Sequence, residues 1–150
     1  MNNSIKEVLL SSGWHEGRNI CIDNYLNWYN SEGYIPSNSV ITFLKEFGGL
    51  QITIPSKSNK SNCDSISNIS IIIDPIENGY EYEFINDYEK FFSTNIFPIG
   101  ISTGPPEIFM DSGGAFYAMY GCIGAKWGDT FEEFVTNIMS GNVNDLEKIY

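Results

Sequence analysis

Residues 40–50, VITFLKEFGGL, decide the fold of this chain. Their large apolar residues recur at the spacing i, i+3, i+4 and i+7, which aligns them along one face of an α-helix. These residues are Val40, Phe43, Leu44 and Phe47. Because a continuous stripe of large apolar side chains is unfavourable in water, this face of the predicted helix must be buried.

The same stretch also sets the ends of the helix. Pro36 and Ser37 form a start signal just upstream, and Gly48 or Gly49 can adopt the left-handed conformation that ends a helix. Residues 50–54 then alternate apolar and polar side chains, which is typical of a β-strand. The sequence therefore predicts a helix that docks onto a sheet.

The length and the cysteine content are typical of a single cytosolic domain. At 150 residues and 16.9 kDa, residues 1–150 can bury a core without metals or disulfides. The chain has no apolar run of about 18 residues and no secretory signal, so we expect a cytoplasmic protein that does not bind membranes. Cys21, Cys63 and Cys122 are odd in number and far apart, which indicates reduced thiols in the core or in loops. We expect a monomer.

The net charge indicates the class of partner. With 19 acidic and 8 basic side chains, the formal charge is −11. This charge repels nucleic acid and anionic membranes and attracts basic proteins. The alternative interpretation is that the acidic residues serve solubility alone.

Further helices and strands follow from the spacing of apolar residues and from turn signals. Helices are predicted over residues 5–12, 23–32 and 131–140. Strands are predicted over residues 69–74, 96–101, 107–110, 115–119 and 122–126. Residues 55–68 are polar and are predicted to form a surface loop, and residues 142–150 form a tail.

Capping residues mark where the predicted helices begin. Ser4 with Glu7 and Thr130 with Glu133 match the capping box, in which each side chain bonds a free backbone N–H of the first turn. Asp23 is the predicted cap of the second helix.

Two further positions leave alternatives open. Pro98 removes a donor from its strand, which indicates an edge strand or a bulge. Trp28 lies off the apolar stripe of its helix, so it is either a second packing surface, which we favour, or an exposed anchor for a partner. Residues 111–114, DSGG, predict the turn of a hairpin.

An acidic stretch at residues 74–89 is the candidate partner-binding surface. Its six carboxylates have no basic neighbour before Lys90, so they repel one another and should spread over a solvated face. Aromatic residues lie between them, as on a surface that binds a basic protein. The candidate residues are Glu77, Tyr80, Glu81, Tyr82, Glu83, Asp87 and Tyr88. An ordinary solvated edge is the alternative.

The sequence offers little support for catalysis, a metal or a cofactor. His15 is the only histidine and lies between Trp14 and Glu16 in a turn, which is weak support for a general base or a metal ligand. The glycine spacings match neither a phosphate-binding loop nor a nucleophile elbow. We therefore expect neither an enzyme nor a bound cofactor or metal.

The order of several short motifs resembles a known family. These are Gly13-Trp14, Gly17-Arg18, FLKEFGGL at 43–50, IDP at 73–75, FPIG at 97–100, Asp111, GAFY at 114–117, Gly124 and a closing helix ending at Gly141. Together they resemble the third subfamily of SUKH immunity proteins from about residue 5 to residue 141. The turn after Trp14 departs from the family, because relatives commonly carry a proline where this chain has His15-Glu16.

The resemblance implies both a fold and a function. It implies an α+β fold with helices on one face of a mostly antiparallel sheet, and an antidote that binds a polymorphic toxin domain in the cytosol without turnover. The motif residues expected to be structural are Gly13, Trp14, Arg18, Phe47, Gly48, Gly49, Pro98, Gly100 and Asp111. A −11 inhibitor could occlude the basic cleft of a nuclease toxin. A general interaction module of the same superfamily is the second hypothesis, and an enzyme using His15 is the third.

Overall fold

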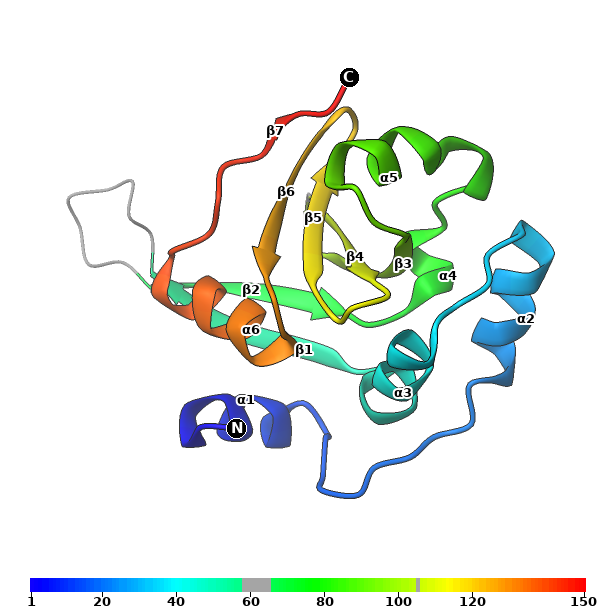
Figure 1. Cartoon of the computed structure of the whole chain (residues 1–150). Coiled ribbons are helices and arrows are strands. Elements are labelled where there is room, and N and C mark those ends of the chain that lie inside the picture. Colours follow the sequence, from blue (N-terminus) through cyan, green and yellow to red (C-terminus); the bar gives the residue numbers. More distant parts are fainter. Residues whose placement is uncertain (58–65, 105) are drawn as a thin grey trace.

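The structure is a computed structural model that describes residues 1–57, 66–104 and 106–150. Within these residues, seven strands form one antiparallel sheet in which each strand pairs with its neighbour in the chain (Figure 1). The strands are β1 Gln51–Lys57, β2 Ile66–Ile72, β3 Ile96–Ser102, β4 Glu107–Asp111, β5 Phe116–Tyr120, β6 Ile123–Gly128 and β7 Glu147–Lys148. The predicted α+β class with an antiparallel sheet is confirmed.

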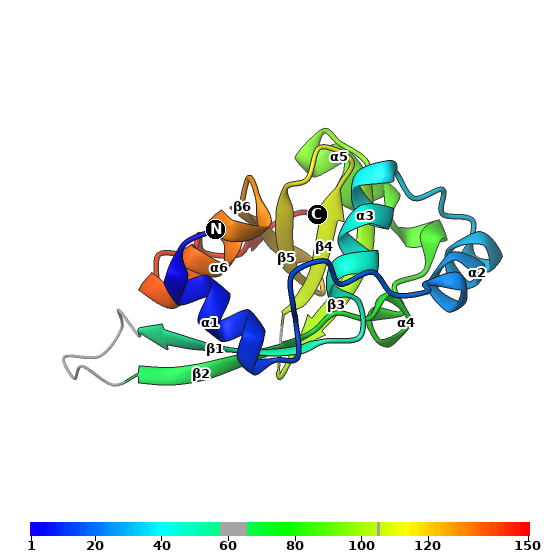
Figure 2. The same ribbon diagram turned by 90° about the horizontal axis from the view of Figure 1, so that it is seen from below.

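Six helices and one 3-10 turn surround this sheet in the described residues. The described helices are α1 Asn3–Ser11, α2 Asp23–Glu32, α3 Asn38–Phe47, α4 Pro75–Asn78, α5 Asn86–Phe92 and α6 Phe131–Ser140, with a 3-10 turn η1 at Tyr82–Phe84. α1 and α6 contact β1, whereas α4 contacts β3 and α2. Figure 2 shows α2, α4 and α5 grouped on one side of the molecule, away from the end of the β1–β2 hairpin.

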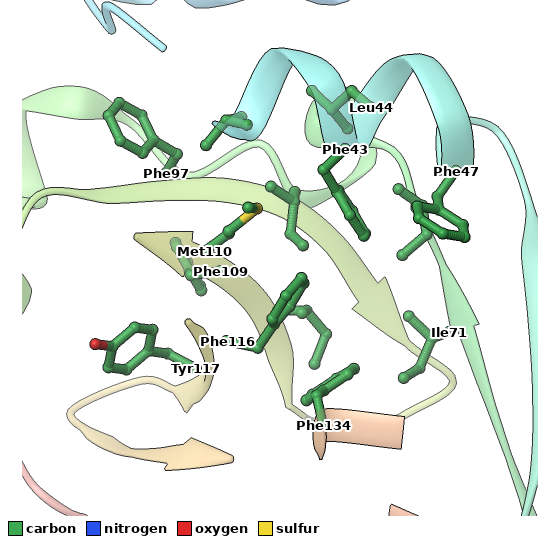
Figure 3. Close-up of a cluster of buried hydrophobic side chains, with 14 of the residues drawn as sticks. Phe43, Leu44, Phe47, Ile71, Phe97, Phe109, Met110, Phe116, Tyr117 and Phe134 are labelled. Atoms are coloured by element: carbon green, nitrogen blue, oxygen red, sulfur yellow. The ribbon is translucent and has the colours of Figure 1, made fainter. Parts of the chain in front are cut away.

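Neighbouring residues of β5 show that both faces of the sheet are covered. The ring of Phe116 lies 5.2 Å from that of Phe43 in α3 and 5.1 Å from that of Phe134 in α6. Tyr117 points away from Phe116 (Figure 3). Its ring lies 4.5 Å from that of Phe92 in α5. Successive side chains of a strand point to opposite faces, so α3 and α6 cover one face and α5 the other. The expectation of helices on one face only was wrong.

Helix α3 has the predicted stripe and the predicted ends. All members of the stripe are buried, and the Ser37 hydroxyl accepts a hydrogen bond from the Val40 N–H. A Cβ atom at Gly48 would lie 2.5 Å from the Leu44 carbonyl oxygen, so no side chain fits there. Gly49 takes the left-handed conformation with φ +78°, and its N–H donates to the Ile73 carbonyl oxygen at 2.7 Å. These two glycines turn the chain from α3 into β1.

Strand β3 carries the bulge that Pro98 predicted. The register between β3 and β4 shifts between Pro98 and Gly100, and β3 lies between β2 and β4 rather than at an edge. A Cβ atom at Gly100 would lie 2.2 Å from the Ile72 carbonyl oxygen. Glycine is therefore needed where β2 and β3 approach each other.

Two predicted helix caps need correction. Asn2 rather than Ser4 caps α1, since its Oδ1 accepts a hydrogen bond from the Ile5 N–H at 2.9 Å. Asp23 is the first residue of α2, and the capping position is Ile22, which has no side-chain hydrogen bond there. α1 begins two residues earlier than predicted, whereas α2 has the predicted bounds and only its cap differs.

The cap of α6 and the predicted hairpin are confirmed. The Thr130 hydroxyl accepts a hydrogen bond from the Glu133 N–H at 3.1 Å, and Gly141 ends α6 with φ +71°. β4 and β5 pair as the predicted hairpin around residues 111–114. The tail contains the short strand β7, which pairs with β6.

The predicted loop at residues 55–68 is shorter than expected. β1 continues through Pro55 to Lys57, and β2 already begins at Ile66, with Pro55 opposite Asn68. The sequence missed this because backbone hydrogen bonds between strands do not require alternating apolar residues. Residues 58–65, which include Cys63, lie outside the described part. Cys21 and Cys122 are exposed free thiols.

The segment between β2 and β3 contains helices that the sequence did not predict. Asp74 begins α4, because its Oδ1 accepts hydrogen bonds from the N–H groups of Ile76 at 2.9 Å and Glu77 at 3.3 Å. The Asn78 side chain is buried and donates to the Gly100 carbonyl oxygen at 2.9 Å and to the Ile108 carbonyl oxygen at 3.0 Å. The segment is therefore fixed to β3 and β4.

Candidate partner-binding surface

The family-motif residues near α3 form a structural clasp. Arg18 donates from Nη1 to the Glu46 carbonyl oxygen at 2.5 Å and from Nη2 to the Gly48 carbonyl oxygen at 2.8 Å. Trp14 is 7 % exposed, and its Nε1 donates to Oε1 of Glu46 at 3.1 Å. Carbonyl groups at a helix C-terminus lack partners within the helix, so the guanidinium both satisfies them and complements the helix dipole. Trp14 and Arg18 thus hold the N-terminal segment against the end of α3.

Asp111 organises the β4–β5 turn. Its Oδ1 accepts hydrogen bonds from the N–H groups of Gly113 at 2.8 Å and Ala115 at 3.0 Å. Its Oδ2 accepts from the Tyr117 hydroxyl at 2.7 Å. Burial and this hydrogen bond raise the pKa of Tyr117.

Pro98 also has a structural role, since its carbonyl oxygen accepts a hydrogen bond from the Tyr29 hydroxyl at 2.6 Å.

Trp28 and Tyr34 continue this packing at the end of α2. Trp28 is half-buried, and its ring lies 5.9 Å from that of Tyr34 in a stacked arrangement. Tyr34 is buried, and its hydroxyl donates to the Tyr80 carbonyl oxygen at 2.8 Å. The packing interpretation of Trp28 is confirmed, and α2 is tied to the acidic segment, the name used below for residues 74–91.

Two aromatic residues of the acidic segment pack against the sheet and hold the segment in place. Tyr88 is 1 % exposed, and its hydroxyl donates to the Gly121 carbonyl oxygen at 2.5 Å. Tyr80 is half-buried and stacks on Tyr88 with ring centroids 4.9 Å apart. Both rings also contact Phe109 of β4. Tyr88 is therefore corrected from a candidate contact to a core residue, because its ring packs on the sheet.

The remaining candidates of the acidic segment lie at the surface. Glu77, Glu81, Tyr82, Glu83 and Asp87 are all exposed. The structure adds exposed apolar side chains that were not among the candidate contact residues, although Phe84 is one of the aromatic residues between the carboxylates. These are Ile76, Phe84 and Phe91, which are 43 %, 56 % and 40 % exposed. Their exposure had no sequence signal, because such residues usually mark a buried face.

Among the described residues, no ion pair is formed by these carboxylates, although the exposed Lys90 belongs to the same segment. In that part of the chain the ion pairs join the Met1 amino group to Glu132 and Lys126 to Asp129, away from the acidic segment. The nearby carboxyl group of Glu83 raises the pKa of Glu81, although the Glu81 carboxyl group is exposed. Two carboxylates held this close favour a cation beside them.

A small pocket opens beside the acidic segment where three parts of the chain meet. It encloses about 180 Å³. Its lining residues are Gly33, Tyr34, Ile35, Tyr82, Glu89, Asn95, Ile96 and Phe97. The rings of Tyr82 and Tyr34 meet edge to face with centroids 5.0 Å apart. Burial raises the pKa of Glu89, and a hydrogen bond from the Ile96 N–H opposes that rise.

A comparison with models of protein families decides the affiliation of the chain. The model of the SUKH-3 immunity protein family matches residues 1–141. The chain belongs to this family. Comparisons with curated proteins and with solved structures give no match.

The SUKH-3 match ends at Gly141, the residue that ends α6, and thus covers the core of the sheet and every family-motif residue. His15, at the departure from the family pattern, is exposed, and its Nδ1 lies 2.9 Å from the Glu16 carbonyl oxygen. In the described residues no three or more His, Cys, Asp or Glu side chains form a group that could hold a metal ion. Among those same residues, no helix has the length and apolarity to cross a bilayer.

Proposed function

We propose that this SUKH-3 protein is the antidote of a cognate polymorphic toxin domain in the cytoplasm. It binds the toxin domain non-covalently and covers its active site, with no chemical step of its own. The contact surface is the exposed side of the acidic segment. The observation that carries this assignment is the set of exposed carboxylates and aromatic rings whose carboxylates form no ion pair in the described structure.

The charge of this surface supports a basic partner. Charge complementarity speeds encounter and disfavours acidic partners, and the formal charge of −11 extends the attraction over the whole molecule. A toxin domain that cleaves nucleic acid needs a basic cleft for its substrate, so an acidic surface can occupy that cleft in place of the phosphates. We therefore propose a nuclease domain as the toxin.

The exposed aromatic rings supply binding affinity, which charge complementarity alone does not provide. Affinity in protein interfaces is concentrated in a few buried aromatic and arginine anchors, whereas charges at the rim contribute less. Tyr82, Phe84 and Phe91 are exposed in the free protein and would become buried in a complex. The anchors Tyr80 and Tyr88 hold the backbone of the segment in place, which lowers the entropy lost on binding.

Co-expression tests this proposal. The chain is expressed with the toxin domain encoded beside it, and survival and co-purification are scored. A segment variant carries Glu77→Gln, Glu81→Gln, Glu83→Gln and Asp87→Asn. A matched control variant loses the same number of exposed carboxylates elsewhere, through Glu16→Gln, Glu133→Gln, Asp145→Asn and Glu147→Gln.

We expect the wild type and the control variant to rescue growth and to co-purify with the toxin domain, and the segment variant to lose both. Death despite soluble wild-type protein, with no complex, would contradict the antidote function and leave the general interaction module. Equal rescue by the segment and control variants would place the contact surface elsewhere.

A further inference from the structure

We infer that the pocket between α2, η1 and the start of β3 receives one long cationic side chain, an arginine or lysine, of the protein partner. This inference rests on the proposed function, because the partner is the basic toxin domain. The pocket thus identifies a single anchor position within the larger contact surface.

The lining of the pocket matches the parts of such a side chain. Ile35 is 87 % exposed at the rim, and Tyr82 is 45 % exposed, so both offer apolar surface to an aliphatic stem. The exposed ring of Tyr82 attracts a cation that lies over its face, whereas the ring of Tyr34 is buried beneath it against Trp28. Glu89 provides the carboxylate that an arginine or lysine pairs with.

The electrostatics around the pocket point to a cation rather than to a neutral group. Glu89 is the one ionisable carboxyl group in the lining, and no basic residue lines the pocket. Glu32 and Glu89 both act on Tyr34, and Glu32 also acts on Glu81, so two further carboxylates lie within electrostatic range of the pocket. The Ile96 N–H engages Glu89. A carboxylate has about four acceptor positions, so Glu89 keeps acceptors for an incoming cation.

The size of the pocket limits the occupant. Sites for whole small molecules enclose about 300–1,000 Å³. The volume here, about 180 Å³, suits one side chain rather than a cofactor. The backbone around it is fixed, because Tyr82 packs over Gly33, where a Cβ atom would lie 3.2 Å from Cδ1 of Tyr82.

A titration of the full chain tests the pocket without any toxin. The probes are N-acetyl-arginine methylamide, the corresponding lysine compound, and N-acetyl-citrulline methylamide, which has nearly the same shape as the arginine probe but no charge. Backbone amide shifts are followed by two-dimensional NMR. We expect saturable shifts at Gly33, Ile96 and Phe97 with the cationic probes, with millimolar dissociation constants, and no saturation with the citrulline probe.

Variants separate the pocket from general charge attraction. Glu89→Gln should weaken the cationic probes at least five-fold, whereas Glu83→Gln, which removes an exposed carboxylate outside the lining, should change affinity less than two-fold. Tyr82→Ala is the second pocket variant, and a thermal melt checks that the loss of its contact with Tyr34 leaves the protein folded. Absence of saturable shifts, equal shifts with citrulline, or unchanged affinity in a folded Glu89→Gln or Tyr82→Ala protein would overturn the inference.

The outcome is distinct from that of co-expression. If the toxin domain co-purifies equally well with Glu89→Gln and with wild type, the pocket inference fails and the antidote function stands. If the cationic probes saturate the pocket but no toxin complex forms, the antidote function fails and the pocket remains a site for a cationic side chain.

Discussion

At the scale of single residues, the hydrogen bonds of Arg18 hold the N-terminal segment against the end of α3. Its two guanidinium hydrogen bonds bridge the carbonyl oxygens of Glu46 and Gly48. Lysine keeps the charge but cannot present this planar fork. We expect Arg18→Lys to lower the free energy of unfolding by about 1–3 kcal/mol, as measured by urea denaturation. Lys6→Ala, a change at an exposed position of α1, is the control and should cost less than about 0.5 kcal/mol. An equal effect of both substitutions would contradict the conclusion that the Arg18 hydrogen bonds stabilise the contact between the N-terminal segment and α3.

Glu107 gives a prediction for the pH dependence of stability. Burial raises the pKa of Glu107 in the folded state. A carboxyl group with a raised folded pKa destabilises the native state at pH values above that pKa, and has no effect below its unfolded pKa of about 4.3. Glu107→Gln should therefore raise the melting temperature at pH 7 and leave it unchanged near pH 3. Glu147→Gln, at an exposed position, is the control for the loss of a negative charge. A gain that persists at pH 3 would contradict the burial argument.

At the scale of elements, the bulge in β3 depends on one glycine. A Cβ atom at Gly100 would overlap the Ile72 carbonyl oxygen in β2, and this is backbone that cannot rotate away. We expect Gly100→Ala to lower the free energy of unfolding by about 2–4 kcal/mol. Gly113→Ala is the milder comparison, since its nearest neighbour is a side-chain oxygen of Asp111 at 3.3 Å. Urea denaturation of the two variants measures the difference, and equal losses would show that β2 and β3 can separate at low cost.

The elements with a clear apolar period could be predicted from the sequence. α3, α6 and the β4–β5 hairpin carry stripes, caps and turn residues that agree with one another, and the structure confirms them. α4, η1 and α5 were missed because helices of one or two turns show no stripe, and they are fixed by contacts with the sheet instead. α5, one of these missed helices, covers the second face of the sheet, which is why the expectation of helices on one face only was wrong.

The candidate site was predictable only in part, for a related reason. The local charge density of residues 74–89 could be seen in the sequence, but the burial of Tyr88 could not, because it depends on Phe109 in β4 and on Gly121 in the distant turn between β5 and β6. The pocket is lined by residues 33–35, by Tyr82 and Glu89 of the acidic segment, and by residues 95–97. No spacing along the chain connects these three stretches, so only the fold reveals the pocket.

At the scale of the whole molecule, charge should control the speed of association. Attraction between a −11 protein and a basic toxin domain is screened by salt, with a Debye length of about 10 Å at 0.1 M. We expect the association rate constant, measured by stopped flow, to fall about ten-fold or more between low and high salt, while the dissociation rate changes less. The segment variant should show a weaker salt dependence than the control variant of equal charge. An association rate indifferent to salt would rule out electrostatic steering.

The insertion of the acidic segment between two adjacent strands has a consequence for divergence within the family. The chain leaves the sheet at β2 and returns at β3, and the segment is fastened from inside by Asn78, Tyr80 and Tyr88. Glu77, Glu81, Glu83 and Asp87 are exposed on this segment and lie outside the core, so substitutions there leave the sheet intact. If this segment binds the toxin domain as proposed, exchange of the segment between relatives would transfer the choice of toxin without changing the sheet.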